Sequence, residues 1–390
     1  MQPCTGSSGE PSRRDPSMAP GVSWLVLASL PLALVAGCAH GTSLRTEPRS
    51  PLERLTPAQR LEAIRRAQVW TPTDIPALDL LVGPQGEGAF ALGETVACDH
   101  QEKKLTGGTP KFYCAIRKHD VLKVKYGVEN GKTFAEVAAT RLFWALGFGA
   151  DADYSVRVVC NGCTADPWNH PEIVPGQTVF DPAVVERKMA GADMEATEGP
   201  GWKWSELDLV DESQGGAPRA QRDALKLLAV MLQHTDNKRD QQALLCLPGG
   251  VVKVAPDAER CTKPFMMVHD VGLTFGTANL ANKNSIGSAN YKKWSETPVW
   301  KDGPGCVGDL SRSWTGTFHD PVISEEGRQF LAHLLVQLSD RQIHDLFAAA
   351  QIERRVVPGE RPDQPKPTVD EWVALFKKKR DEIVNRTCPR

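Results

Sequence analysis

Long apolar runs are scarce in this chain of 390 residues. The one that stands out covers residues 22–37 (VSWLVLASLPLALVAG) and is interrupted by Pro31. A membrane-spanning helix needs about 20 apolar residues, so this run is short for a span, and no second run follows it. Its length and position are typical of an export signal.

Several other features are missing as well. The formal net charge is −2 and no basic block occurs, whereas nucleic-acid-binding domains carry a basic face or stripe. We therefore expect no nucleic-acid partner. The chain has no GxSxG elbow, no HExxH helix and no Walker loop, which argues against the hydrolase, zinc-protease and P-loop chemistries that depend on them.

The apolar run ends in Val35, Ala36 and Gly37, directly before Cys38. This ending resembles the bacterial lipobox. The resemblance implies a signal peptide over residues 1–37, a lipid on Cys38, and an exported protein anchored to the membrane on the periplasmic or surface face of the envelope. The alternative is an ordinary secretory signal, which also implies export. Residues 39–56 are polar and contain two prolines, so we expect a tether over residues 38–56.

The cysteines fit an exported protein. Of the ten, Cys4 lies in the leader and Cys38 in the lipobox, which leaves eight. An even number in an oxidising compartment indicates disulfides, and the candidates are Cys98, Cys114, Cys160, Cys163, Cys246, Cys261, Cys306 and Cys388. Two pairings have local support, Cys98–Cys114 about the turn at residues 106–107 and, less strongly, Cys246–Cys261. The CxxC at 160–163 is alternatively half of a zinc site, although no second CxxC exists.

Hydrophobic patterning predicts an α+β chain. Three strands are expected within residues 94–126, followed by a helix whose capping box is Thr133 with Glu136. Further helices are expected over 57–68, 220–233, 324–355 with a break, and 368–386, and two short apolar stretches lie at 243–247 and 265–276. This places a β-rich lobe at residues 57–175 and a mostly helical lobe at 176–390.

Charged residues recur at the ends of these elements. Lys125 ends a strand and Glu136 lies in the next helix. A buried helix then leads into the motif HxDxxxxQ, with His234, Asp236 and Gln241, and a later apolar strand ends in Asp270-Val271-Gly272. This order resembles that of the protein-kinase-like superfamily, above all its atypical branches: secreted Golgi-type kinases, CotH kinases, HipA-like toxins and phosphoinositide kinases. The chain also resembles a group of bacterial lipoproteins.

The resemblance implies a two-lobed fold and a role for each residue. Lys125, held by Glu136, would neutralise phosphates, and Asp236 would take the proton of the acceptor hydroxyl. Asp270 and Gln241 would hold Mg²⁺ bound with ATP. The implied activity is transfer of a phosphoryl group, or of AMP, to an envelope protein or another acceptor. The alternative is a non-catalytic kinase-like scaffold that binds a partner at the envelope.

Three departures from the family pattern leave alternatives open. Gly107 and Gly108 lie where the phosphate-binding loop is expected, yet they also suit a plain hairpin turn. Gln241 stands where asparagine is usual. Lys123 lies on the same strand face as Lys125, so either lysine is a candidate for the phosphate contact. His234 follows a buried helix and suits a structural role.

Overall fold

The computed structural model describes residues 44–45, 52, 54–255, 258–277, 286–314, 316–361 and 363–389. All of them belong to one compact unit. Cys38 and the expected signal peptide therefore lie outside the described residues. Within the described part of the chain, no helix combines the length and the apolar composition that crossing a membrane requires.

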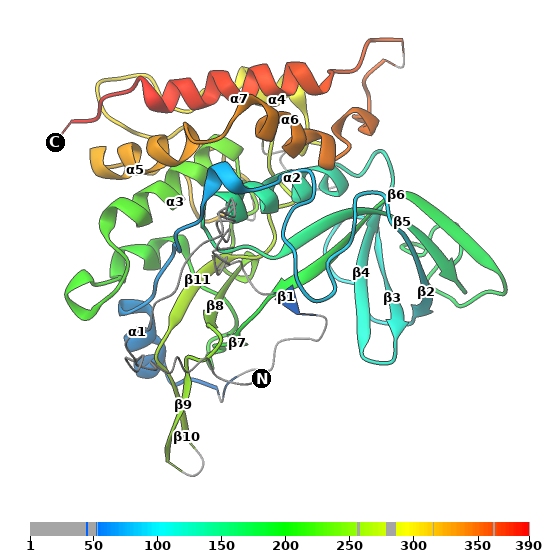
Figure 1. Ribbon diagram of the computed structural model, residues 1–390, viewed down its shortest axis with the longest axis horizontal. Helices are drawn as coiled ribbons and strands as arrows, with labels where there is room; N and C mark the ends of the chain where they lie inside the picture. Colours follow the sequence, from blue (N-terminus) through cyan, green and yellow to red (C-terminus); the bar gives the residue numbers. More distant parts are fainter. Residues whose placement is uncertain are drawn as a thin grey trace, which may run out of the picture. The chain divides into compact units, whose positions relative to one another are not determined.

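A closed sheet dominates the region coloured cyan to green in Figure 1. It has six strands in the order β1-β6-β4-β3-β2-β5, and β6 pairs with β5 as well, so β6, β4, β3, β2 and β5 form a barrel. The three strands expected within 94–126 are confirmed as β2, β3 and β4. The closure of the sheet is not apparent from the sequence. The strands are β1 (Leu44–Arg45), β2 (Thr95–Gln101), β3 (Lys111–Arg117), β4 (Asp120–Tyr126), β5 (Ala152–Asn161) and β6 (Gln177–Met189).

Alternation along β4 separates the core of the barrel from its outer face. Leu122 and Val124 are buried inside the barrel with residues such as Phe112. Because successive side chains of a strand point to opposite faces, Lys123 and Lys125 lie on the outer face. This outer face of β4 forms part of the site described below.

Two disulfides cross-link the barrel. The predicted bridge Cys98–Cys114 is present, with the two Cα atoms 5.5 Å apart. The two residues are offset along the strands, because Cys114 pairs with His100. Cys160 and Cys163 are bonded to each other, so the CxxC is a disulfide and not half of a zinc site.

Helix α2 (Lys132–Ala145) packs against the barrel, and its start differs from the prediction. Its N-cap is Gly131, with no side-chain cap, so the capping box of Thr133 with Glu136 is wrong. Thr133 lies inside the first turn, and its hydroxyl has no hydrogen-bond partner in the structure. Glu136 is buried and its carboxylate contacts Lys125. The carboxylate therefore does not cap the amides at the start of the helix.

Helices α3, α5, α6 and α7 gather on one side, where α7 lies above α5 and α6 with α3 beneath them, whereas α1 lies apart from this group (Figure 1). Helix α3 is buried along Asp223–Leu232, as expected for a central helix. The predicted break within 324–355 separates α5 from α6. The α-helices besides α2 are α1 (Pro57–Arg65), α3 (Arg219–Leu232), α4 (Tyr291–Glu296), α5 (Glu325–Leu335), α6 (Asp340–Ala349) and α7 (Val369–Val384).

Two small sheets accompany the barrel in the described part of the chain. The first has the order β11-β8-β7 and the second is the hairpin β9–β10. The predicted bridge Cys246–Cys261 is present and joins β8 to the end of the hairpin, and Cys306 is bonded to Cys388. These strands are β7 (Ala192–Asp193), β8 (Gln242–Cys246), β9 (Val251–Ala255), β10 (Ala258–Cys261) and β11 (Pro264–Val268).

The segment expected as a tether is partly built into the fold. Leu44 and Arg45 form β1 and pair with Met189 and Lys188 of β6. Leu52 is buried, and its amide donates a hydrogen bond to Asp193. The leucines of this polar segment explain the difference, because each buries an apolar side chain. The barrel also extends past residue 175, since β6 is one of its strands.

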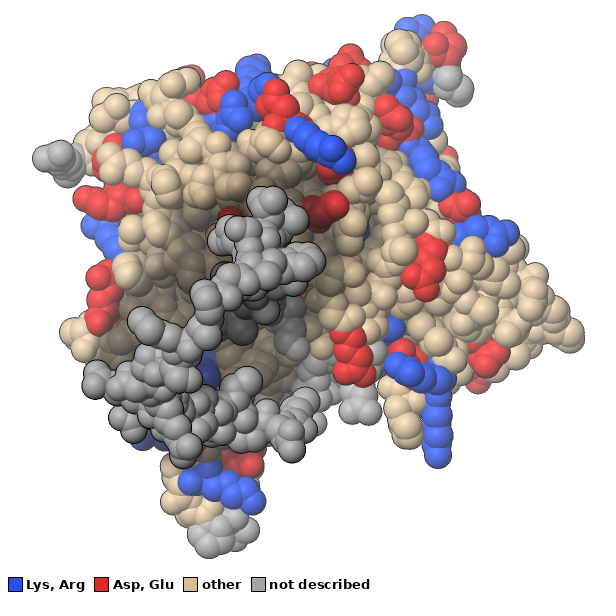
Figure 2. Space-filling view, viewed as in Figure 1, with Lys and Arg blue, Asp and Glu red and all other residues tan. Residues whose placement is uncertain are grey.

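Charges of both signs are interspersed over the face of the molecule shown in Figure 2. This agrees with the small net charge of −2.

Candidate functional site

A cavity of about 530 Å³ lies along the outer face of the barrel. It brings together six residues that the sequence singled out: Gly107, Gly108, Lys123, Asp236, Gln241 and Asp270. Seven of its lining residues are lysine or arginine and four are aspartate or glutamate, so the cavity is positively charged. Its other lining residues are Lys103, Thr106, Thr109, Lys111, Tyr113, Val121, Lys132, Glu186, Arg187, Lys188, Lys238, Asp240 and His269.

Lys125 and Glu136 form a buried ion pair behind this cavity. The Lys125 ammonium contacts the Glu136 carboxylate, and their side chains are 4% and 2% exposed. Burial by itself lowers the pKa of Lys125, but Glu136 outweighs it and raises the pKa, so the lysine stays charged. The pair joins strand β4 to helix α2, as the resemblance implied.

Asp270 follows β11 and reaches the cavity beside helix α2. Its Oδ1 lies 3.3 Å from the Nζ of Lys132 and accepts a hydrogen bond from the Gly272 amide at 3.2 Å. Burial raises the pKa of Asp270, but Lys132, Lys125 and Lys123 outweigh it and hold the pKa well below its ordinary value. The carboxylate is therefore ionised at neutral pH.

Gly272 makes this approach possible. A Cβ atom at this position would lie 2.3 Å from Oε1 of Glu136 and 2.6 Å from Cδ of Lys132. Any other residue would push the Asp270 turn away from α2, so the glycine of the DxG motif has a steric reason here.

Asp236 and Gln241 lie in the loop between α3 and β8. The Nε2 of Gln241 donates a hydrogen bond to Oδ2 of Asp236 at 3.1 Å. The carbonyl oxygen of Gln241 accepts hydrogen bonds from the amides of His269 and Asp270, at 2.9 and 3.2 Å. Gln241 thus connects Asp236 to Asp270 through its side chain and its backbone.

The loop around Asp236 is fixed from below. Asn237 is fully buried, and its Oδ1 accepts hydrogen bonds from the amides of Thr317 and Phe318 at 2.8 and 2.9 Å. His234 is also buried, and both of its ring nitrogens lack a partner in the structure. Burial lowers the pKa of His234 to about 4, so its ring is neutral and its role is structural, packed against Trp204.

The loop between β2 and β3 covers the cavity with Gly107 and Gly108. Gly107 has φ +85°, and a Cβ atom there would lie 2.9 Å from the Nζ of Lys111. Lys111 pairs with Lys125 across the sheet. Among the described residues, no carboxylate lies within ion-pair distance of Lys111. Burial, together with Lys125 and Lys132, lowers its pKa to about 8.

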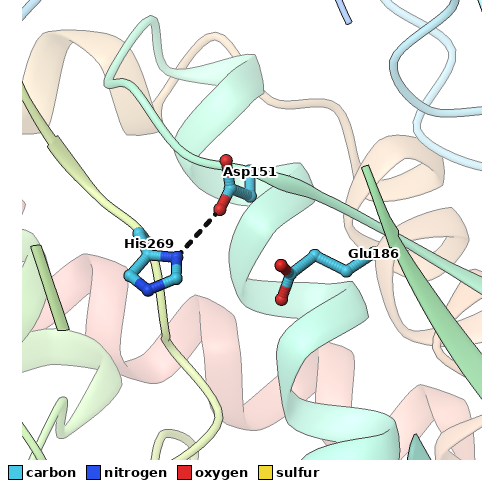
Figure 3. A group of neighbouring side chains, drawn as sticks. All are labelled: Asp151, Glu186 and His269. Carbon is cyan, nitrogen blue, oxygen red and sulfur yellow. Dashed lines mark hydrogen bonds and ion pairs between the residues drawn. The ribbon is translucent and has the colours of Figure 1, made fainter. Parts of the chain in front are cut away.

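The opposite wall of the cavity carries a second ionic cluster, which we call the β6 network: Lys123, Glu186, Lys188, Asp151 and His269. Glu186 contacts both Lys123 and Lys188. The Nζ of Lys188 lies 2.8 Å from Oδ2 of Asp151 and 3.0 Å from Nδ1 of His269. Asp151 and His269 also contact each other, and the Glu186 carboxylate faces the same space (Figure 3).

Asp151, Glu186 and His269 have the spacing of metal ligands. The Lys188 ammonium contacts all three, so it already supplies the positive charge that their arrangement favours. The β6 network is therefore complete without a metal ion.

The donors at the other end of the cavity suit magnesium better. Mg²⁺ prefers oxygen ligands and binds through one or two carboxylates together with substrate phosphates. Asp270 is ionised and held by a single lysine at 3.3 Å, and Gln241 can offer its amide oxygen because its nitrogen is on Asp236. These residues fit a magnesium ion that would neutralise phosphate charge.

The sequence did not single out Lys111, Lys132, Glu186 or Lys188. Lys111 had a detectable signal, since the predicted hairpin places it near Lys125. Lys132 is the first residue of α2. The predicted cap at Thr133 started the helix later and so left Lys132 outside it. Glu186 and Lys188 lie on β6, a strand that Pro-, Trp- and Gly-rich sequence obscured.

Comparisons with known proteins give little more. No family model and no curated protein matches this chain. One solved structure that this chain resembles weakly is the proinflammatory kinase CtkA of Helicobacter pylori, with 10% sequence identity and a TM-score of 0.36, covering 76% of this chain and 95% of that one. A TM-score of 0.36 is too low to indicate a shared activity.

Proposed function

We propose that this protein is an exported, lipid-anchored, kinase-like phosphotransferase. In this proposal the barrel and α2 act as a small lobe, the helical region acts as a large lobe, and the cavity between β4 and the Asp236 loop binds Mg²⁺ with ATP. A phosphoryl group, or AMP, passes to an envelope protein or another acceptor.

One observation carries the proposal. The Lys132–Asp270 pair and the Gln241–Asp236 hydrogen bond lie on one cavity, and the buried Lys125–Glu136 pair lies directly behind it. Phosphoryl transfer depends on positioning and on neutralising phosphate charge, and these residues supply cations, an ionised carboxylate for a metal, and a carboxylate that can accept a proton.

In this mechanism each residue has a separate task. Lys125 is kept charged and oriented by Glu136, and with Lys111 and Lys132 it stabilises negative charge on the donor. Asp270 and Gln241 would hold magnesium, which would supply positive charge next to the donor phosphates. Asp236 accepts the proton of the acceptor hydroxyl as its oxygen attacks phosphorus.

The four disulfides support export, because such bonds persist in oxidising compartments. Lipid attachment to Cys38 is proposed from the lipobox. We expect the protein in the membrane fraction, with lipid on Cys38, and expect Cys38→Ala to abolish lipidation and processing. Unchanged processing and membrane association of this variant would refute lipid attachment.

Thermal unfolding with and without Mg-ATP tests the site. A ligand that binds only the folded state stabilises it by about 2.7 kcal/mol at 100 times its dissociation constant. Asp270→Ala should abolish this stabilisation, while Asp302→Ala, an exposed residue outside the cavity, should preserve it. If wild-type protein shows no shift with any magnesium–phosphate ligand, the proposed function is wrong.

A non-catalytic scaffold is the second candidate, and one contact favours it. The proposed metal ligand Asp270 is paired with Lys132, as it would be in a cavity that never takes a metal. Ligand binding without transfer to any acceptor would support this candidate.

A further inference from the structure

The β6 network lines one part of the cavity with charged groups, through Lys123, Glu186, Lys188 and His269. Tyr113 and Lys123 are neighbours across β3 and β4, and Lys123 contacts Glu186 of β6. A row of polar groups therefore runs across the sheet at this level. It lies one side-chain position from the row of Lys111 and Lys125.

The network is ionised and internally satisfied. Burial lowers the pKa of Lys123, but Glu186 outweighs it and raises the pKa. Burial raises the pKa of Glu186, but Lys123 and Lys188 outweigh it and lower the pKa. Each charge has an opposite partner, and displacing Glu186 would leave Lys123 buried without its partner, which is costly.

A nucleobase needs a different surface. Small-molecule sites for flat rings are lined mainly by apolar and aromatic side chains, and a base stacks on an aromatic face. Among the lining residues, the aromatic rings are those of Tyr113 and His269, and Val121 is the one large aliphatic side chain. The Nζ of Lys103 lies 4.4 Å from the centre of the Tyr113 ring, so one face of that ring is already covered.

The same lining suits a chain of phosphates. Lys111 is crowded by Lys125 and Lys132, and this crowding contributes to its low pKa. Lys132 holds Asp270 at 3.3 Å. An anion placed between these lysines would relieve their repulsion, and the bare backbone at Gly107 and Gly108 allows close approach.

We propose that the donor bound here is recognised through its phosphates alone, and that a base-free condensed phosphate, such as inorganic triphosphate or pyrophosphate, is the substrate class of this cavity. This inference rests on the proposed function and narrows it. Adenosine contributes no binding energy, and the base of ATP stays outside the β6 network.

The reaction balances without a nucleoside. The oxygen of the acceptor hydroxyl forms a bond to the terminal phosphorus, and the bond from that phosphorus to the bridging oxygen breaks. The bridging oxygen keeps the electron pair, and the hydroxyl proton passes to Asp236. The leaving group is pyrophosphate from a triphosphate donor and phosphate from a pyrophosphate donor.

Calorimetric titration of the full chain tests the inference, with Mg²⁺ present and four probes: inorganic triphosphate, pyrophosphate, ATP and adenosine. We expect triphosphate and ATP to bind with dissociation constants within about threefold of each other, and adenosine not to bind. ATP binding more than about thirtyfold tighter than triphosphate would overturn the inference while leaving the proposed function intact. Binding of no phosphate at all would overturn both.

A pair of lysine variants on one hairpin sharpens the test. Lys111→Met should weaken triphosphate and ATP by the same factor, about tenfold or more, and Lys111→Arg should restore most of the affinity. Lys118→Met is the matched control, since Lys118 is exposed at the other end of β3, outside the cavity, and should change neither. A loss confined to ATP would show that the base is recognised, and would overturn the inference.

Discussion

Lys123 and Lys125 stand two residues apart on one face of β4, and each meets a buried glutamate from a different element. Lys125 contacts Glu136 of helix α2, so its pair links the sheet to the helix beside Asp270. Lys123 contacts Glu186 of the neighbouring strand β6, which Lys188 shares. The two pairs therefore differ in what they connect: the first joins the sheet to helix α2, and the second joins two neighbouring strands.

The largest expected effect is a loss of transfer activity on replacing Asp236, with ligand binding at the Asp270 end of the cavity retained. Asp236→Asn keeps the hydrogen-bonding shape but removes the proton acceptor, so transfer should fall by about 10²- to 10⁴-fold. Binding of the magnesium–phosphate ligand should survive. Single-turnover phosphoryl transfer measures this, and transfer at the wild-type rate would show that the chemistry does not use Asp236.

Stability should distinguish the two lysines next. Lys125→Met leaves Glu136 buried without its ion-pair partner, which should lower the free energy of unfolding by about 3–5 kcal/mol. Lys123→Met should cost less, because Glu186 retains Lys188. Denaturant unfolding measures both, and adding Glu136→Gln to Lys125→Met should recover part of the loss. Equal losses for the two single variants would remove the distinction.

The barrel that carries both lysines should depend on its disulfides to different degrees. Replacing Cys98 and Cys114, which are 16 residues apart, by serine should cost about 3 kcal/mol in the chain-entropy model. Replacing Cys160 and Cys163, 3 residues apart, should cost about 1 kcal/mol less, because the closed loop is shorter. Unfolding of the paired serine variants decides it, and the reverse order would contradict the model.

The smallest expected effect is a pH dependence of ligand affinity. The pKa of Lys111 is lowered to about 8 by burial and by its neighbouring lysines, and a bound phosphate would raise it again. Since the ligand prefers the protonated amine, affinity should be nearly constant below pH 7. It should fall by up to about tenfold for each pH unit above 8. Titrations from pH 6 to 9.5 measure this, and a Lys111→Arg variant should lose the dependence.

The sequence predicted the local elements well because short-range signals govern them. The alternation of apolar and polar residues in β2, β3 and β4 can be read directly from the sequence. The same is true of the run of apolar residues in helix α3. Closure of the barrel was not predictable, since it depends on β6 pairing with both β4 and β5, and strand pairing over such distances leaves no local pattern. The start of α2 was missed because Thr133 and Glu136 match a capping box in spacing alone.

Residues of the candidate site could be predicted where their order along the chain matches a known order of motifs. The order of motifs that resembles the protein-kinase-like superfamily named Asp236, Gln241 and Asp270, which the structure places on one cavity, and Lys125 with Glu136, which lie behind it. The β6 network was not predictable, because Asp151, Glu186 and His269 come from three segments that meet only in the folded chain. Lysines such as Lys132 give no signal until the partner across the cavity is known.

The barrel and the hairpin β9–β10 also differ in the edges that they offer to other chains. Closure pairs every strand of the barrel on both sides, so the barrel gives no template for strand addition. The hairpin has two strands, and Val251, Val252 and Val254 of β9 are 38%, 39% and 59% exposed. If this protein aggregates on partial unfolding, we expect the first intermolecular strand pairing at β9, where an exposed apolar edge is already formed.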